Sequence, residues 1–254
     1  MDVDVTVQGP LPGSADYARR KIGSLAKFTH GPVAYARVRL TNRTHRWLPR
    51  PVVAQANLEI NGRRVRAQVE ASTASEAIDA LQDRLRRILE RQSRHRPPRG
   101  KFRHVVGEHH GQPTEPRWPT DSAAGEARRI IRHKSFGVAR LSVEEAAEEL
   151  DLLDHHFYLF TEKSTGRDSV LYRSGPTGYR LAQTKSAAQE RVTQPHDPVT
   201  VSPAAPPELT VAQAVERLNL VGLPFLFFVD VAQGRGSVLY LRYDGQYGLI
   251  TPAA

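Results

Sequence analysis

The stretch GRDSVLY at residues 166–172 returns 68 residues later as GRGSVLY at residues 234–240. The flanking sequence keeps this offset without a gap, because LSVEEAAEELDLLDHHFYLF at 141–160 aligns with LTVAQAVERLNLVGLPFLFF at 209–228. An internal repeat indicates one structural unit that is built twice. The C-terminal half of the chain is therefore expected to contain two copies of one small fold.

Each copy predicts a short helix followed by three short strands. Both helices begin with a capping box, Ser142 with Glu145 and Thr210 with Gln213, in which each pair satisfies free backbone N–H groups. The strands of the first copy are FYLFT, SVLY and the segment at Tyr179, and those of the second are FLFFV, SVLY and the corresponding segment. Each repeat is expected to be a small α+β unit.

A unit of this size needs a partner to cover its apolar sheet. The run FLFFV at 225–229 has no polar face, which indicates a strand buried on both sides. We expect the two repeats to pair within one chain, as a monomer with an internal pseudo-dimer, although pairing between chains would use the same surfaces. The residues expected at this interface are Phe157, Phe160, Val170, Tyr172, Phe225, Phe227, Val238 and Tyr240.

The first 92 residues predict the element order β-α-β-β-β-α. Val3 to Val7 alternate with period two, and Ser14 is expected to cap a helix that ends before Gly31 and Pro32. Three strands follow, AYARVRL, VAQANLEI and RVRAQVEA, and Asn61-Gly62 joins the last two as a hairpin. Ser75 precedes the final helix. Two helices are expected to cover one face of a four-stranded sheet.

Alternation directs the arginines of these strands away from the core. If Val38 and Leu40 point inward, Arg37 and Arg39 point outward, and the same reasoning places Arg64 and Arg66 on the outer face. On the last helix, arginines recur at steps of three and four residues and form a ridge. The candidate RNA-binding residues are Arg19, Arg20, Lys21, Lys27, Arg37, Arg39, Arg64, Arg66, Arg84, Arg87, Arg91 and Arg94.

The positive charge of the chain is concentrated in this domain. Residues 1–100 hold 19 Lys and Arg against 9 Asp and Glu, whereas residues 101–254 hold 17 against 18. Arginine suits phosphate because its planar fork donates two hydrogen bonds to one group and keeps its charge. With the basic loop NRTHRW at 42–47, this segregation favours a domain that binds structured RNA. No helix resembles a major-groove reader of DNA.

We therefore expect an α+β protein with five segments. They are the RNA-binding domain at 1–92, a flexible linker at 93–133, the first repeat at 134–183, a Pro-rich linker at 184–207 and the second repeat at 208–254. Both linkers are rich in proline and polar residues.

Several function classes find no support in the sequence. The chain has no cysteine, and its first residues lack the basic start and apolar run of a signal peptide. No window is apolar enough for a membrane span, so we expect a cytoplasmic protein. Adjacent histidines such as His155-His156 point to opposite faces of a strand and make a poor metal site. No cofactor, metal, small-molecule substrate or catalytic residue is expected, and the protein is not expected to be an enzyme.

Together, the β-α-β-β-β-α domain ending in AIDALQDRLRR, the SVEEAAEELDLLDHHFYLF helix and strand, and the ending VLYLRYDGQYGLITP resemble the long ribosome hibernation promoting factors. The two-repeat layout resembles the mycobacterial stress-induced members. The resemblance implies a domain that binds 16S ribosomal RNA in the decoding region of the small subunit, where it blocks messenger RNA and the A- and P-site transfer RNAs. It also implies that the basic positions of the family fall on Lys21, Lys27, Arg84, Arg87 and Arg91.

In most long members, the resemblance implies a single C-terminal domain that pairs with its counterpart on a second ribosome. This chain departs from that pattern because it carries two such units, and position 154 is Asp where the family usually has Gly. We expect hibernation of single ribosomes, and whether the repeats also contact ribosomal proteins stays open. Two alternatives stay open: a stress-response adaptor whose repeats bind another protein, and a conventional factor that joins two ribosomes.

Overall fold

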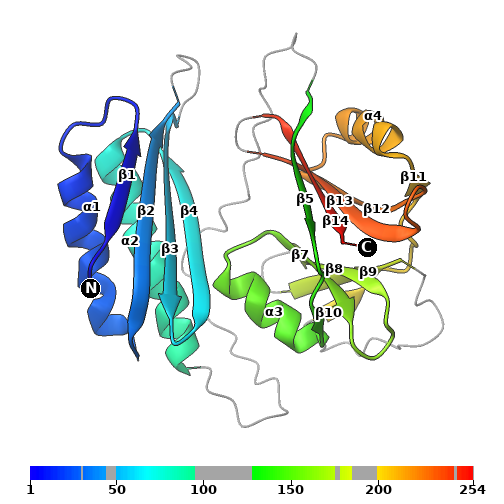
Figure 1. The fold of residues 1–254 in the computed structure, drawn as a ribbon, viewed down its shortest axis with the longest axis horizontal. Coiled ribbons are helices and arrows are strands. Elements are labelled where there is room, and N and C mark those ends of the chain that lie inside the picture. Colours follow the sequence, from blue (N-terminus) through cyan, green and yellow to red (C-terminus); the bar gives the residue numbers. More distant parts are fainter. Residues whose placement is uncertain are drawn as a thin grey trace. The chain divides into compact units, whose positions relative to one another are not determined.

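The structure is a computed structural model, and it describes residues 1–29, 31–43, 50–94, 128–174, 178–184, 199–242 and 245–253. The described residues fall into two compact units. One holds the N-terminal sheet and its helices, and the other holds the two repeat sheets (Figure 1).

The N-terminal unit is a four-stranded sheet in the order β1-β2-β3-β4. The strands are β1 (Asp4–Gln8), β2 (Val33–Asn42), β3 (Val52–Ile60) and β4 (Arg63–Ala71), and β1 runs parallel to β2 while the other pairs are antiparallel. The helix α1 (Ser14–Gly23), the 3₁₀ helix η1 (Ser24–Phe28) and the helix α2 (Ala74–Arg94) supply the rest of one hydrophobic core. Figure 1 shows α1 and α2 on the same face of the sheet. This arrangement confirms the expected β-α-β-β-β-α order.

Local sequence explains the turns of this unit better than its helix starts. Asn61 and Gly62 have positive φ angles of 52° and 73°, as a two-residue hairpin turn requires. Ser14 does not cap α1, because its hydroxyl donates to the carbonyl of Leu11 while Gly13 holds the N-cap position. The helix also gives way to η1 at Ser24, well before Gly31.

The start of α2 likewise differs from the expected Ser75. Thr73 precedes the helix, and its hydroxyl accepts from the backbone N–H of Glu76 at 3.2 Å. The carboxylate of Glu76 accepts in turn from the N–H of Ser72, at 3.2 Å. The chain therefore satisfies its free helix N–H groups two residues earlier than the sequence suggested.

Each repeat has the predicted helix and three antiparallel strands. The first contains α3 (Val143–Leu152), β7 (Phe157–Glu162), β8 (Asp168–Ser174) and β9 (Gly178–Gln183), and the second contains α4 (Val211–Val221), β12 (Phe225–Asp230), β13 (Arg235–Leu241) and β14 (Tyr247–Pro252). Both capping boxes are present: Glu145 bonds Ser142, and Gln213 bonds Thr210. These helix starts are confirmed.

Each sheet is completed by strands that the sequence did not predict. Two-residue strands, β6 (Arg140–Leu141) and β11 (Glu208–Leu209), pair with β7 and β12. The strand β5 (Ile130–Phe136) lies before α3 of the first repeat but pairs with β14 of the second, and β10 (Val199–Val201) lies before α4 of the second repeat but pairs with β9 of the first. Residues 130–133 and 199–201, expected to lie in linkers, are thus parts of sheets.

The exchange of β5 and β10 follows the repeat offset. Leu181 of β9 is paired with Val201 of β10 in the first sheet. The repeat counterparts of these two residues, 68 residues away, are Leu249 and His133, and they are paired in the second sheet. Figure 1 shows the green β5 running along the red β14. Each repeat therefore donates the strand that precedes it to the sheet of the other repeat.

Candidate nucleic-acid interface and repeat interface

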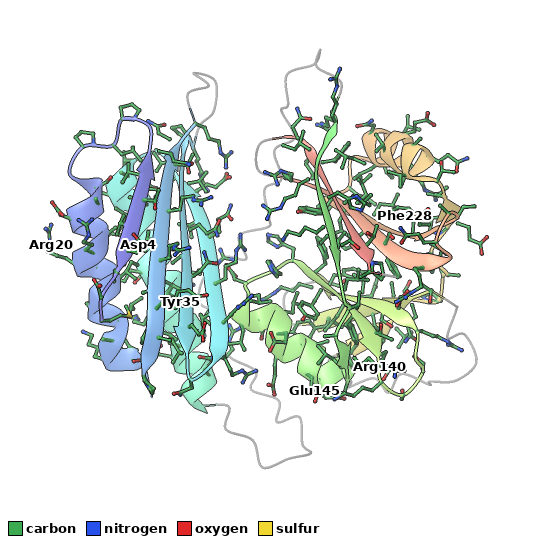
Figure 2. All side chains as sticks on the ribbon, viewed as in Figure 1. Asp4, Arg20, Tyr35, Arg140, Glu145 and Phe228 are labelled. Carbon is green, nitrogen blue, oxygen red and sulfur yellow. The ribbon has the colours of Figure 1, made fainter. Side chains whose placement is uncertain are left out.

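The outer surface of α1 carries cations held by neighbouring groups. Lys21 Nζ lies 2.7 Å from Asp79 on α2, and the hydroxyl of Tyr17 donates to the same carboxylate at 2.8 Å. Hydrogen bonds to Asp79 and Tyr17 raise the pKa of Lys21, and the ammonium of Lys21 lowers the pKa of Asp79. Arg20 is exposed on α1 (Figure 2). Its guanidinium lies over the Tyr17 ring, 5.8 Å from the ring centroid. The hydrogen bonds to Asp79 and Tyr17 favour the charged form of Lys21 at the helix surface.

The ridge on α2 projects from the flank that faces away from α1. Gln82 of α2 donates to the backbone carbonyl of Lys21, which places it on the flank toward α1. At 100° per residue, Arg84, Arg87 and Arg91 fall on the other flank. Arg87 and Arg91 are exposed and Arg84 is half-buried. Arg94 ends the helix, and its side chain lies outside the described part.

Two cations and an aromatic ring form a cluster at the junction of η1 and α2. Lys27 lies over the ring of Phe28 at 5.1 Å from its centroid, and Arg86 lies 5.9 Å from the same centroid. Arg86 also pairs with Glu90 at 3.5 Å. The sequence analysis missed Arg86 and Phe28, although the spacing of Arg86 and Glu90 at four residues was visible. Lys27 and Arg86 extend the basic surface across the junction of η1 and α2.

The opposite face of the sheet carries the other predicted arginines, in register across the strands. Arg37 is the neighbour of Asp4 on β1, and its Nε donates to that carboxylate at 3.2 Å. Arg66 donates to Gln68 at 2.5 Å. Glu59 on β3 is paired with Tyr35 on one side and with Arg64 on the other, and Glu70 on β4 is paired with Val53. The residues Arg37, Arg39, Arg64 and Arg66 are exposed or half-buried, as alternation predicted.

Eleven of the twelve predicted cations, all except Arg94, therefore fall on two faces of the N-terminal unit. We call the surface of α1, η1 and α2 with Arg19, Arg20, Lys21, Lys27, Arg84, Arg87 and Arg91 the helical face, and the surface with Arg37, Arg39, Arg64 and Arg66 the sheet face. Figure 2 shows Arg20 on α1, and Asp4 and Tyr35 on β1 and β2. A single flat ligand cannot touch both faces at once.

In the C-terminal unit, an aromatic cluster lies between the two repeat sheets. The ring centroids of Phe157 and Phe225 are 4.8 Å apart, Tyr172 lies 5.4 Å from Phe225, and Tyr240 lies 5.7 Å from Phe157. Leu159, Val170, Phe227 and Val238 form the buried centre of the same cluster. The structure thus brings together seven of the eight residues expected at the repeat interface.

Phe160 is the exception and corrects the sequence analysis. It is fully buried in the separate core between α3 and the first repeat sheet, with Leu150 and Leu171. Because side chains alternate along a strand, Phe157 and Leu159 face the other repeat while Phe160 faces the helix. The second copy behaves alike, since Phe227 faces the first repeat and Phe228 packs against α4 (Figure 2).

Comparisons with known proteins match both units. The family model described as sigma 54 modulation protein / S30EA ribosomal protein matches residues 12–96, and the model of its C terminus matches twice, at 125–181 and 199–249. A dormancy associated translation inhibitor of Mycobacterium tuberculosis (strain CDC 1551 / Oshkosh) is 36% identical over 257 residues, which cover 98% of this chain and 88% of that protein.

The chain belongs to the sigma 54 modulation/S30EA ribosomal protein family. A ribosome hibernation promotion factor of Bacillus subtilis (strain 168) is 24% identical over 177 residues, or 68% of this chain and 92% of its own length. The N-terminal domain of Protein Y from Thermus thermophilus covers 36% of this chain and 99% of its own, with 23% identity and a TM-score of 0.30. The resemblance to hibernation factors with two C-terminal repeats is confirmed.

Metal sites and membrane spans were considered for the described part of the chain. No cluster of His, Asp or Glu that could hold a metal ion occurs in the described ranges, and none of the helices described is long and apolar enough to cross a membrane. Residues 44–47 of the predicted basic loop fall outside the described residues.

One buried carboxylate of this family member anchors a hairpin of the first repeat. Glu162 is 4% exposed and accepts from the hydroxyl and N–H of Ser164 and from the N–H of Thr165. Burial alone would raise the pKa of Glu162, but these hydrogen bonds lower it to about 2. Its repeat counterpart, Asp230, accepts from the N–H of Ala232.

Glu162→Gln is expected to lower the free energy of unfolding by about 1–2 kcal/mol at pH 7, because the charged hydrogen bonds become neutral. The folded pKa lies below the ordinary value of 4.5, so the ionised group stabilises the protein above that value and loses this effect as the pH falls toward 2. Urea unfolding at pH 7, 5 and 3 should therefore show the difference shrinking. The exposed Glu216→Gln serves as the control, and an unchanged difference at pH 3 would contradict the assignment.

Proposed function

We propose that this protein is a ribosome hibernation factor. Its N-terminal domain binds 16S ribosomal RNA in the decoding region of the small subunit and blocks messenger RNA and the A- and P-site transfer RNAs. It thereby inhibits translation in the cytoplasm and protects idle ribosomes under stress, without catalysis and without a cofactor. The observation that carries the proposal is the helical face, a basic surface on a domain of the S30EA family.

The helical face supports an RNA partner through the kind of contact it can make. Arg20, Arg87 and Arg91 are exposed guanidinium groups, each able to donate two hydrogen bonds to one phosphate. Lys21 and Lys27 lie beside aromatic rings, which hold ammonium groups in place. The acids Asp16, Asp79 and Asp83 lie among these cations. Such a mixed pattern favours a folded RNA whose phosphates match the positions of the cations over an arbitrary polyanion.

The sheet face supports a secondary role. Arg37 already contacts Asp4. Glu59 of β3 is paired with Arg64, and Glu70 lies on the same strand as Arg64 and Arg66. Its potential is therefore weaker than that of the helical face. We infer that the helical face makes the main RNA contacts and that the sheet face contributes less.

The paired repeats support action on single ribosomes. In the C-terminal unit the aromatic side chains of one repeat cover those of the other, and the strands β5 and β10 are exchanged between the sheets. The surface that a second chain would need is thus filled from within the chain. A monomer with an internal pseudo-dimer binds one ribosome, and its repeats remain available for contacts to ribosomal proteins.

The test is sedimentation of purified small subunits and whole ribosomes with the full chain at rising salt. We expect the protein in the small-subunit and single-ribosome fractions, with binding that weakens steeply because each neutralised phosphate releases counterions. Added messenger RNA and transfer RNA should compete. Probing every gradient fraction for the protein distinguishes this function from a ribosome-dimerising factor and from an adaptor.

A ribosome-dimer peak that forms only with the protein would contradict the single-ribosome mode and support a conventional dimerising factor. Absence from every ribosomal fraction would contradict ribosome binding and support the adaptor function. A protein that co-sediments at low and high salt alike would contradict phosphate contacts as the driving force.

A further inference from the structure

The repeated heptapeptide differs between its copies at one position. Asp168 in GRDSVLY corresponds to Gly236 in GRGSVLY, and the other six residues are identical. Both residues are buried, at the starts of β8 and β13. The difference therefore lies in the interior of the C-terminal unit, where neither residue is exposed to solvent.

Asp168 is a buried carboxylate that bonds the other repeat. It is 6% exposed and accepts from Arg235 Nε at 2.7 Å, from Arg235 Nη2 at 3.0 Å and from the backbone N–H of Gly236 at 3.0 Å. Thr161 of its own repeat donates at 3.3 Å. Three of the four hydrogen bonds therefore cross from one repeat to the other. Burial raises the pKa of Asp168, but these donors lower it overall, so they favour the charged form.

Gly236 leaves the space that this contact requires. A Cβ atom at this position would lie 2.8 Å from the Cβ of Asp168 and 2.9 Å from side-chain carbons of Phe227 and Thr184. Contacts this short force neighbouring atoms to move. The backbone of β13 can thus approach Asp168 only because residue 236 has no side chain.

We propose that Asp168, Arg235 and Gly236 form a specificity determinant that pairs the first repeat with a second repeat and disfavours pairing of like with like. This inference rests on the proposed pairing of the repeats and names the residues that direct it. The partner that fits the first repeat is a repeat with Gly, and not Asp, at the corresponding position.

Pairing of two first repeats would bring two aspartates to one place. Because the repeats correspond residue by residue, a second Asp168 would occupy the position of Gly236, with its Cβ about 2.8 Å from the first. Pairing of two second repeats would leave Arg235 without its carboxylate and a gap at the glycines. Both arrangements lose the bonds that a mixed pair makes. A chain that carries one repeat of each type therefore favours its own internal pair over a symmetric pair with another chain.

The test is a double-mutant cycle on the full chain: D168G, G236D and the exchange variant D168G/G236D, with thermal unfolding of the repeats as the readout. In D168G both copies read GRGSVLY, and in G236D both read GRDSVLY. In the exchange variant the aspartate moves to the second copy, where Arg167 takes the part of Arg235.

We expect G236D to lower the unfolding midpoint by about 10 °C or more and D168G by about 5 °C or more. The exchange variant should lose less than the sum of the two single losses, since it restores one Asp opposite one Gly. A loss equal to the sum or greater would overturn the proposal, because the two positions would then act independently.

Two milder variants keep the test decisive if G236D does not fold. D168N removes the charge at nearly constant volume, and G236A adds one methyl group. Each should lower the midpoint by several degrees, whereas G137A, at an open position, should leave it unchanged. Unchanged midpoints for both D168N and G236A would also overturn the proposal.

Sedimentation velocity and ribosome binding of the wild-type protein test the proposed function separately from the specificity determinant. A wild-type dimer in solution would contradict internal pairing, yet the cycle would still report on first-to-second pairing, because the same contacts would form between chains. Failure of wild-type protein to bind ribosomes would contradict hibernation and leave the cycle unaffected. An additive cycle in a ribosome-binding monomer would contradict the specificity determinant alone.

Discussion

Replacing Arg84, Arg87 and Arg91 together by alanine is expected to weaken binding to the small ribosomal subunit about a thousandfold or more. Hydrogen bonds to charged groups contribute about 1.5–3 kcal/mol each, and about 1.4 kcal/mol is tenfold in affinity. The three side chains project from one flank of α2 and lie outside the buried positions of the core. The substitution should therefore remove phosphate contacts while the domain stays folded, which circular dichroism can verify.

The salt dependence gives a second, independent measure of the same contacts. Each lost phosphate contact should make the slope of log affinity against log salt shallower by about 0.7–0.9, so the triple variant should lose roughly two to three units of slope. Replacement of the same residues by lysine keeps the charge. That variant should keep the slope and lose part of the affinity, because lysine lacks the two-pronged guanidinium.

A matched charge change on the other face separates the two faces of the domain. R37A/R39A/R64A removes three positive charges from the sheet face, and we expect a much smaller loss than from the helical face. Equal losses from the two triple variants would contradict the primary role of the helical face. If the helical-face variant bound the small subunit as tightly as the wild-type protein, the proposed RNA contacts would be contradicted and the adaptor function would be favoured.

The parts of the fold that local patterns specify could be predicted from the sequence. Alternation along β2 placed Val38 and Leu40 in the core and Arg37 and Arg39 outside, as the structure has them. The Asn61-Gly62 turn and both capping boxes also depend on neighbours within four residues. Such features are read correctly because the determining contacts lie within one segment.

The exchanged strands could not be predicted because their partners are far away in the chain. β5 pairs with β14 more than 110 residues later, and β10 has only three residues, too few for a periodic pattern. The prediction that Phe160 lies at the repeat interface was wrong for a different reason. Phe157 and Phe160 are three residues apart on one strand, so alternation already puts them on opposite faces, and the structure shows that the face with Phe160 meets the helix.

The division of the arginines between two faces follows from the expectations that the helices cover one face of the sheet and that the strand arginines point away from it. In the structure α2, which carries Arg84, packs on the inner face, and Arg64 lies exposed on β4. Asp168 gave a visible signal, since it was the one difference in a repeated heptapeptide. The role of Asp168 could not be predicted from this difference, because it depends on the hydrogen bond from the backbone N–H of Gly236 in the other repeat.

Phe227→Ala is expected to lower the free energy of unfolding of the C-terminal unit by about 3–4 kcal/mol, as truncation of a buried aromatic side chain does. Phe227 belongs to the second repeat, but it packs with Leu159 and Val170 of the first. The loss should therefore appear in both repeats. Hydrogen exchange read by mass spectrometry should show weaker protection in β8 as well as in β13.

An exposed residue of the same repeat provides the control. Leu220 is 88% exposed near the end of α4, so Leu220→Ala should change neither stability nor exchange. If Phe227→Ala weakened protection in β12 and β13 but left β8 unchanged, the repeats would fold independently and the shared core would not hold them together. Coupled loss in both is expected instead, because the aromatic cluster and the exchanged strands β5 and β10 tie each sheet to the other. Ribosome binding through the helical face should survive the substitution, since the N-terminal unit has its own core.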